Sequence, residues 1–204
     1  MCPEPEELPV VQPVPALPER ADAARNRSKV LAAAVRLFAE RGASCVSMDD
    51  VATAAGVGKG TVFRRFGDTA GLAAAVLSEQ TRRLQDAIIR GPAPLGPGAP
   101  PLDRLIAFGR EYIETHTPHL DLLRMGERAG ARTRSAPYAF WHLHVAMLVR
   151  EAAPELDAEY VADVLLAALS ADVLAHLQDE REMPRERIAA GWAQLVRRLL
   201  DSPM

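Results

Sequence analysis

Two very short helical segments lie on either side of a glycine turn in the first third of this chain. Ser47 directly precedes the first segment, and Asp49 and Asp50 follow within its first turn. A serine hydroxyl can cap a helix start, and acidic residues suit its positive end. The turn Gly56-Val57-Gly58 follows, and glycine can take a positive φ there without steric cost. The second short helix is expected from Lys59 to about Phe66. Two short helices joined by such a turn have the form of a helix-turn-helix.

The second short helix carries too many polar and basic side chains for a core element. Val62 and Phe66 are four residues apart and can pack inward, whereas Lys59, Thr61 and Arg64 project outward. Residues 20–90 hold twelve Lys/Arg and seven Asp/Glu, although the whole chain has a net charge of -3. A basic segment between acidic ones is typical of a DNA-binding module attached to a separate core. We therefore predict a DNA recognition helix; the alternative is that its arginines are solvated surface charges.

The remaining pattern is helical throughout, with no convincing strand alternation, and predicts an all-α fold. Asp68 is expected to cap the start of a fourth helix. The predicted divisions are a disordered Pro/Glu-rich arm over 1–25, a helix-turn-helix domain over 26–70, a connecting helix over 71–90, a Pro/Gly linker over 91–101 and a larger helical domain over 102–204. Within the last of these, helices are expected near 102–117, 118–125, 137–153, 154–178 and 184–200. The stretch 126–136 reads as a basic surface loop.

Four helices in register also carry a family resemblance. From Arg27 to Leu77, the stretches LAAAVRLFAERG, VSMDDVATAAGVGKGTVFRRFGDTAGL and AAAVL resemble the N-terminal domain of regulators of the tetracycline-repressor-like (TetR) family. The match covers about a quarter of the chain. The resemblance implies a three-helix DNA-binding domain joined by a fourth helix to a larger domain for ligand binding and dimerisation.

Carried over by position, the resemblance implies phosphate contacts by Ser47 and by the start of the recognition helix. Three positions depart from the family pattern: Phe63 replaces a tyrosine, Thr69 a lysine and Gly58 a capping serine. Phe63 can offer only an apolar contact, such as with a thymine methyl group, and Thr69 only a neutral phosphate contact. The expected DNA-binding residues are Arg27, Ser47, Lys59, Gly60, Thr61, Phe63, Arg64, Arg65 and Thr69.

Two apolar stripes in the C-terminal half predict a dimer interface, because two helices from each subunit would form a four-helix bundle. A dimer also places two recognition helices on a palindromic site. The competing interpretation is that both stripes only bury the core of one subunit. The predicted interface residues are Val161, Leu165, Ala168, Ile188, Trp192, Leu195 and Leu199.

A mixture of bulky, polarizable and polar side chains lies between the linker and these stripes, as an effector pocket requires, although each can equally be plain core. The predicted pocket residues are Tyr112, His116, Met125, Tyr138, Trp141, His142 and Met147. His116 and His119 can share a helix face, but no cysteine or carboxylate completes a ligand set, so no metal or other cofactor is predicted.

Several classes of protein are disfavoured. No phosphate-binding glycine loop or nucleophile elbow suggests an enzyme. No membrane segment or signal peptide is visible, which together with the unlike contexts of Cys2 and Cys45 favours a cytoplasmic protein. We predict a homodimeric regulator, a repressor released from palindromic double-stranded operator DNA by a small effector. The alternative is a helical ligand- or partner-binding protein that has lost strong DNA binding.

Overall fold

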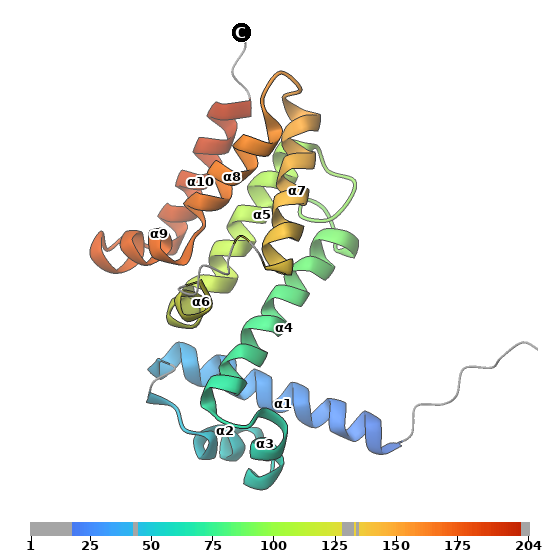
Figure 1. Ribbon diagram of the computed structural model, residues 1–204, viewed down its shortest axis with the longest axis vertical. Coiled ribbons are helices and arrows are strands. Elements are labelled where there is room, and N and C mark those ends of the chain that lie inside the picture. Colours follow the sequence, from blue (N-terminus) through green and yellow to red (C-terminus); the bar gives the residue numbers. More distant parts are fainter. Residues whose placement is uncertain (1–17, 43–44, 128–132, 134, 201–204) are drawn as a thin grey trace, which may run out of the picture.

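The computed structural model describes residues 18–42, 45–127, 133 and 135–200 of the protein. All regular structure in these ranges is helical, and no strand occurs within them, so the predicted all-α class is confirmed. Figure 1 shows α1 to α3 at one end, the C-terminal helices at the other, and α4 running between the two.

Three helices build the N-terminal end: α1 (Pro18–Arg41), α2 (Met48–Ala55) and α3 (Lys59–Phe66). Their core consists of apolar residues spaced at three and four positions, as the sequence pattern predicted. Leu31, Ala34 and Phe38 of α1 are buried against Val51 of α2 and Val62 of α3. Burial of one face of each helix leaves the opposite face of α3 in solvent.

The first helix is longer than expected. The pattern predicted a disordered arm as far as residue 25, but α1 begins at Pro18. Proline is tolerated in the first turn because the N–H that it lacks has no partner inside the helix there. Arg25 and Asp22, three residues apart, form an ion pair on the next turn of α1. Residues 1–17 of the predicted arm lie outside the described residues.

The glycine turns end the helices largely as predicted. Gly42 follows α1 with φ 76°, and Gly56 follows α2 with φ 63°, the left-handed region that disfavours any side chain. Gly58 differs, because its φ is -60° and a side chain would be tolerated there. The Asp68 side chain accepts a hydrogen bond from the Gly71 amide and caps the next helix, as expected.

Helix α4 (Thr69–Arg90) belongs to two separate hydrophobic cores. Leu72 and Val76 lie in the N-terminal core, whereas Leu84 and Ile88 lie in the C-terminal one. Leu122, from the C-terminal body, also packs in the N-terminal core. Because dense cores transmit displacements, a shift among the C-terminal helices has two routes to the three N-terminal helices.

The C-terminal body contains α5 (Pro101–His116), η2 (Thr117–His119), α6 (Leu120–Glu127), α7 (Ala136–Ala152), α8 (Ala158–Ala168), α9 (Ala171–Ala175), η3 (His176–Glu180) and α10 (Arg185–Leu200). Helices α5 and α10 are in close contact at Gly109. A Cβ atom on Gly109 would lie 2.1 Å from the Trp192 ring, and the Trp192 Nε1 donates a hydrogen bond to the Leu105 carbonyl at 3.1 Å. Absence of a side chain at Gly109 therefore lets the indole lie directly on α5.

The helix expected over 154–178 is interrupted, which corrects the prediction. α8 ends at Ala168, and Ser170 caps α9 by accepting a hydrogen bond from the Val173 amide. The apolar spacing continued through this break, so periodicity alone missed it. Among the described helices none is by itself long and apolar enough to cross a membrane. Only α8 taken together with 171–180 has the length and composition to do so, and that pair is bent by 41°.

Candidate DNA-binding interface

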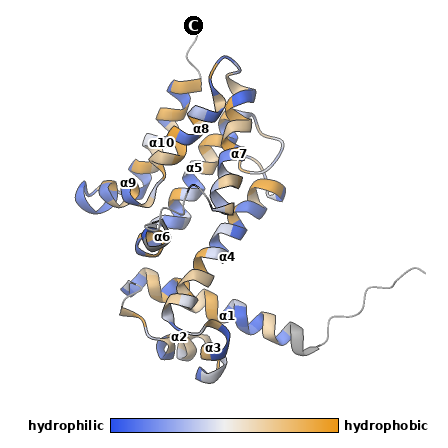
Figure 2. Cartoon of the chain, viewed as in Figure 1, coloured by the Kyte–Doolittle hydropathy of each residue, from blue (hydrophilic) through white to orange (hydrophobic). Residues whose placement is uncertain are grey.

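Helix α3 presents a polar and basic surface held in place by one buried contact. Val62 is only 1% exposed, whereas Phe63 is 40% exposed and the side chains of Arg64 and Arg65 lie in solvent. Figure 2 shows the hydrophilic residues that this short helix carries. An exposed aromatic ring between basic side chains is costly to leave in water, and it is a reasonable contact for the apolar parts of DNA.

The start of α2 is closed by a reciprocal capping box. The Asp50 amide donates to the Ser47 hydroxyl oxygen at 3.2 Å, and the Ser47 amide donates to Asp50 Oδ2 at 3.0 Å. The Ser47 hydroxyl also donates to Asp50 Oδ2 at 2.6 Å. These hydrogen bonds hold the pKa of Asp50 below its usual range. A phosphate contact by Ser47 would therefore require its hydroxyl hydrogen to turn away from Asp50.

Lys59 at the start of α3 contacts both a carboxylate and an aromatic ring. Its Nζ lies 2.5 Å from Asp49 Oδ2 and 5.7 Å from the centroid of the Phe63 ring. Both ionic side chains are more than half exposed, so the pair contributes little stability and Lys59 can exchange Asp49 for a phosphate. Gly60 follows with open space where a Cβ would lie, which leaves the α3 backbone accessible.

The other predicted contacts lie around the same end of the molecule. Thr61 is half-buried on α3, and Thr69 is the first residue of α4, directly after its cap. Arg65 Nη1 donates to the Ala23 carbonyl of α1 at 3.0 Å. The structure therefore gathers the predicted positions on α2, α3 and the start of α4, and it gives Arg65 an internal partner that the sequence pattern did not reveal.

Arg27 belongs to an ion-pair cluster that links α1 to α4. Glu79, whose side chain is 14% exposed, lies 3.2 Å from Arg27, 2.7 Å from Arg82 and 3.2 Å from Arg83. Hydrogen bonds from Arg82 first, and then from Arg27 and Arg83, outweigh burial and lower the pKa of Glu79 to about 2. Glu79 therefore stays ionised and fixes the position of Arg27.

We expect this cluster to stabilise the fold at neutral pH and to weaken in acid. The Glu79 pKa falls from 4.5 to about 2 on folding, so the contribution is complete above about pH 4.5 and is lost as the pH falls towards 2. Because the arginine partners are solvated, Glu79→Gln should lower the free energy of unfolding by about 1 kcal/mol at pH 7 and by less than half as much at pH 3. Urea unfolding at both pH values measures this; equal losses would contradict it, and Glu40→Gln is the exposed control.

Comparison with known proteins decides the family of the N-terminal domain. Residues 30–76 match the model for bacterial regulatory proteins of the tetR family. The N-terminal domain belongs to the TetR family. The predicted family is thereby confirmed, and the TetR domain indicates a DNA-binding transcriptional regulator. No curated protein matches the chain.

Solved structures resemble the chain well beyond the TetR domain. A putative TetR-family transcriptional regulator from Rhodococcus sp. has 21% identity and a TM-score of 0.62, over 87% of this chain and 99% of that one. A putative transcriptional regulator from Saccharomonospora viridis, crystallised in complex with choline, has 20% identity and a TM-score of 0.61, over 85% and 96%. NalD of Pseudomonas aeruginosa, the secondary repressor of the MexAB-OprM multidrug efflux pump, has 20% identity and a TM-score of 0.53, over 87% and 96%. The TetR-type helical fold therefore extends through the C-terminal body.

The predicted effector residues of this TetR-type chain lie mainly within the C-terminal core. Tyr112, His116, Tyr138 and Trp141 are buried. His116 stacks on Tyr112 with ring centroids 4.1 Å apart, and burial lowers the pKa of His116 to about 4, so it is neutral at pH 7. The side chain of Met125 lies outside the described residues, as does most of the loop predicted over 126–136.

The other two predicted pocket residues lie nearer the surface. His142 is half-buried beside Glu159 and Asp163 of α8, with His142 Nε2 3.5 Å from Asp163 Oδ1. Asp163 also accepts a hydrogen bond from the Tyr138 hydroxyl at 2.6 Å. No group of three or more His, Cys, Asp or Glu suited to a metal ion occurs in the described ranges. Met147 is 42% exposed.

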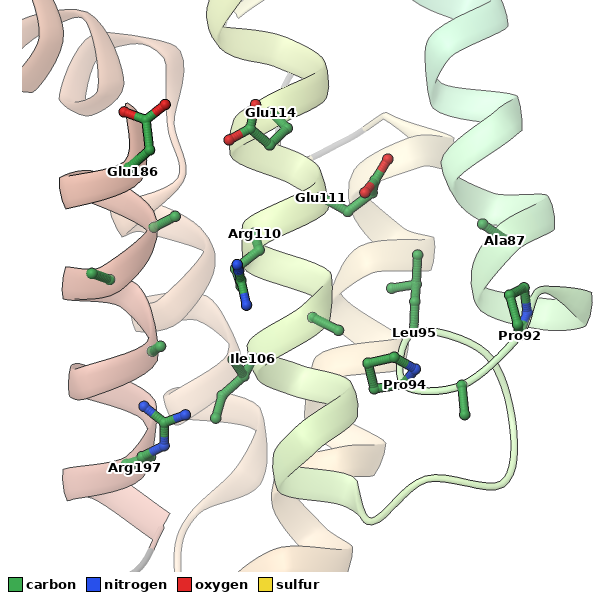
Figure 3. A pocket seen from close by; sticks show the side chains of 15 residues that line it. Ala87, Pro92, Pro94, Leu95, Ile106, Arg110, Glu111, Glu114, Glu186 and Arg197 are labelled. Atoms are coloured by element: carbon green, nitrogen blue, oxygen red, sulfur yellow. The ribbon is translucent and has the colours of Figure 1, made fainter. Parts of the chain in front are cut away.

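Concave sites in the C-terminal body are lined mostly by residues that the sequence pattern did not single out. The α5 groove, of about 790 Å³, is lined by Ala87, Pro92, Ala93, Pro94, Leu95, Ile106, Ala107, Arg110, Glu111, Glu114, Glu186, Ala189, Ala190, Ala193 and Arg197. Figure 3 shows Arg110 of α5 and Arg197 of α10 extending into the space between these helices. The α4–α7 hollow, of about 280 Å³, is lined by Ile88, Ile89, Pro97, Arg104, Phe140, Leu143, His144 and Met147.

His144 is a buried polar group that the sequence pattern missed. It is 5% exposed, and its Nε2 has no hydrogen-bond partner among the residues that the structure describes. Burial first, and then Arg104, lower the pKa of His144 to about 4. His144 and His142 are two residues apart and point to different faces of α7, but spacing alone does not say which of the two faces is buried.

The predicted dimer residues divide between the inside and the outside of the subunit. Leu165, Ile188 and Trp192 are between 1% and 7% exposed and pack in the core. For these three residues the structure agrees with the alternative that the stripes bury the core of one subunit. Leu195 is 47% exposed. Val161, Ala168 and Leu199 are half-buried. Some residues of an apolar stripe therefore pack in the core of the subunit, while others on the same helix remain at its surface.

Proposed function

We propose that the protein is a homodimeric, sequence-specific DNA-binding regulator that represses transcription and is released from a palindromic operator by a small effector. The observation that carries this proposal is the exposed, basic surface of α3, held by buried Val62 and bordered by an aromatic ring of which 40% is exposed. Such a surface suits a binding protein rather than an enzyme.

The contacts divide into those that position the protein and those that read sequence. We assign phosphate contacts to Ser47 and Thr69 and to the first residues of α3, where free helix amides favour anions. Arg64, exposed and without a carboxylate partner among the described residues, is assigned to base edges. Phe63 is assigned to an apolar contact with a thymine methyl group.

Dimerisation is assigned to the outer faces of α8 and α10. The α8–α10 hollow has a volume of about 490 Å³ and is lined by Ile113, Ala168, Leu169, Val173, Leu177, Met183, Arg187, Ile188, Ala190, Gly191, Trp192, Gln194 and Leu195. Earlier on α8, Tyr160 and Val164 are 69% and 49% exposed. Apolar surface of this extent is typical of a protein interface, and a second copy of the chain supplies a matching surface by two-fold symmetry.

We expect Leu195→Glu to convert the dimer into a monomer. Two carboxylates, one from each subunit, would lose water in the proposed interface, and that desolvation opposes association. The mass measured by light scattering after size-exclusion chromatography tests this, with circular dichroism as the check on folding. Glu155→Gln, at an exposed position outside the hollow, should leave the mass unchanged. A folded Leu195→Glu dimer would exclude this interface.

Effector release is assigned to movement of α4. The α5 groove includes Ala87, and the α4–α7 hollow includes Ile88 and Ile89, so a ligand in either touches the last turns of that helix. The relative crystallised with choline and the repressor NalD support ligand binding and repression in this fold. A hundredfold preference of the effector for the DNA-free state is about 2.7 kcal/mol, which is enough to change operator occupancy substantially.

Selection of bound sequences from a random duplex pool tests the proposed function. Enrichment of a palindrome, with affinity that falls steeply as salt rises, would support a dimeric sequence-specific regulator. A folded dimer that enriches no sequence would instead favour the ligand- or partner-binding alternative. The enriched duplex then serves for an effector screen, in which a ligand that leaves DNA affinity unchanged at saturation would exclude release.

A further inference from the structure

The first turns of α1 extend beside the recognition helix instead of ending at its base. Figure 1 shows the N-terminal part of α1 continuing past α3. Arg65, near the end of α3, donates from Nη1 to the Ala23 carbonyl at 3.0 Å and ties this extension to the recognition helix. Two elements that the chain separates by 42 residues therefore form the two walls of one groove.

The α1–α3 groove has a volume of about 480 Å³ and is lined by Asp22, Ala23, Asn26, Arg27, Val30, Val57, Thr61, Val62, Arg64, Arg65 and Phe66. Its one lining carboxylate, Asp22, is paired with Arg25, and Arg27 is paired with Glu79. Arg64 and Arg65 have no carboxylate partner within the described ranges. The groove therefore keeps an excess of positive charge.

Asn26 adds a neutral hydrogen-bonding group to the same wall. Its side chain is half-buried and has no hydrogen-bond partner in the part of the chain that the structure describes. A carboxamide can donate two hydrogen bonds, and a phosphate oxygen accepts them without a change in protonation. Thr61, on the α3 wall, offers a hydroxyl in the same groove.

We propose that the α1–α3 groove binds the sugar-phosphate backbone of one DNA strand, next to the base pairs that α3 reads, with Asn26 and Arg65 contacting a phosphate. This inference rests on the proposed DNA-binding function and adds Asn26 and the first turns of α1 to the contact surface. A DNA strand fits better than a free anion, because the groove is continuous with the exposed side of α3 through Thr61 and Arg64. Phosphate contacts of this kind set register and orientation on the duplex.

Arg65 has two roles in this arrangement. One N–H group holds the α1 extension, and the others remain available for a phosphate, which a guanidinium fork binds in a bidentate manner. Loss of Arg65 removes a charge and releases α1 at the same time. Asn26→Asp leaves the tie intact but places a negative charge in the groove.

The test titrates the selected palindromic duplex with wild-type protein, Arg65→Met, Asn26→Asp and the control Arg36→Met, which removes an exposed arginine elsewhere on α1. We expect Arg65→Met to reduce the slope of log K against log salt by about 0.9 per subunit. Asn26→Asp should weaken binding about tenfold or more through like-charge repulsion. Arg36→Met should match the wild type in both measurements.

Phosphate ethylation interference identifies the contact itself. The wild type should be sensitive to ethylation at a backbone phosphate beside each half-site, and Arg65→Met should lose that sensitivity while keeping the rest of the pattern. Wild-type binding with no such phosphate, or two groove variants that bind like Arg36→Met, would overturn the inference while the DNA-binding function stands. Failure of the wild type to bind any selected duplex would overturn both. Thermal unfolding of each variant confirms that it is folded.

Discussion

Replacement of Arg64 by alanine should weaken operator binding by about 2–6 kcal/mol, because a dimer loses two base contacts of about 1–3 kcal/mol each. Arg64 is the exposed α3 side chain with a guanidinium fork and no carboxylate partner in the described ranges. The variant should also lose preference at the base pair that Arg64 contacts. Titration against the selected palindrome and its single-base variants measures both effects.

Two matched variants separate base reading from phosphate binding. Lys59→Ala should weaken binding to all duplexes fairly uniformly and reduce the salt dependence, since a phosphate contact carries no sequence information. Arg90→Ala removes an exposed arginine at the far end of α4 and should change neither property. Equal behaviour of Arg64→Ala and Lys59→Ala would contradict this division of roles.

Trp192→Ala should lower the free energy of unfolding by about 3–5 kcal/mol, the range for removing a buried large aromatic side chain. The indole is 5% exposed, lies directly on Gly109 and donates a hydrogen bond to the Leu105 carbonyl. Alanine would leave a cavity between α5 and α10 and an acceptor without its partner. Urea unfolding followed by circular dichroism measures the loss.

Two further variants, Trp192→Phe and Gln194→Ala, serve as comparisons for the loss of stability in Trp192→Ala. Phenylalanine keeps most of the buried ring but not the Nε1 donor, so its loss should be smaller than that of alanine. Gln194 lies two residues after Trp192 on the same helix, and its side chain is exposed. Its replacement should change the free energy of unfolding by less than about 0.5 kcal/mol. A Trp192→Ala variant as stable as Gln194→Ala would show that this contact does not hold α5 to α10.

Local signals predicted the DNA-binding end of the molecule well. Ser47, Gly56 and Asp68 each act through hydrogen bonds or backbone conformation within a few residues, so the pattern of neighbours was sufficient to locate the ends of α2, α3 and α4. The start of α1 was missed because proline and acidic residues are common both in disordered arms and in first helical turns.

The C-terminal body shows where local signals fail. The apolar stripe through Leu165 and Ile188 was correctly helical, but spacing does not say whether a face meets the same subunit or another copy. The break after Ala168 was hidden because Ser170 interrupts the helix without interrupting the apolar spacing.

The helical class, the helix-turn-helix and the basic surface of α3 follow from the amino-acid sequence, because capping, glycine turns and side-chain periodicity act over a few residues. The packing of whole helices brings together groups that are distant in the chain: Arg65 with Ala23, Arg27 with Glu79, and Trp192 with Gly109. These contacts join residues between 42 and 83 positions apart, and they depend on how whole helices pack rather than on any neighbouring residue.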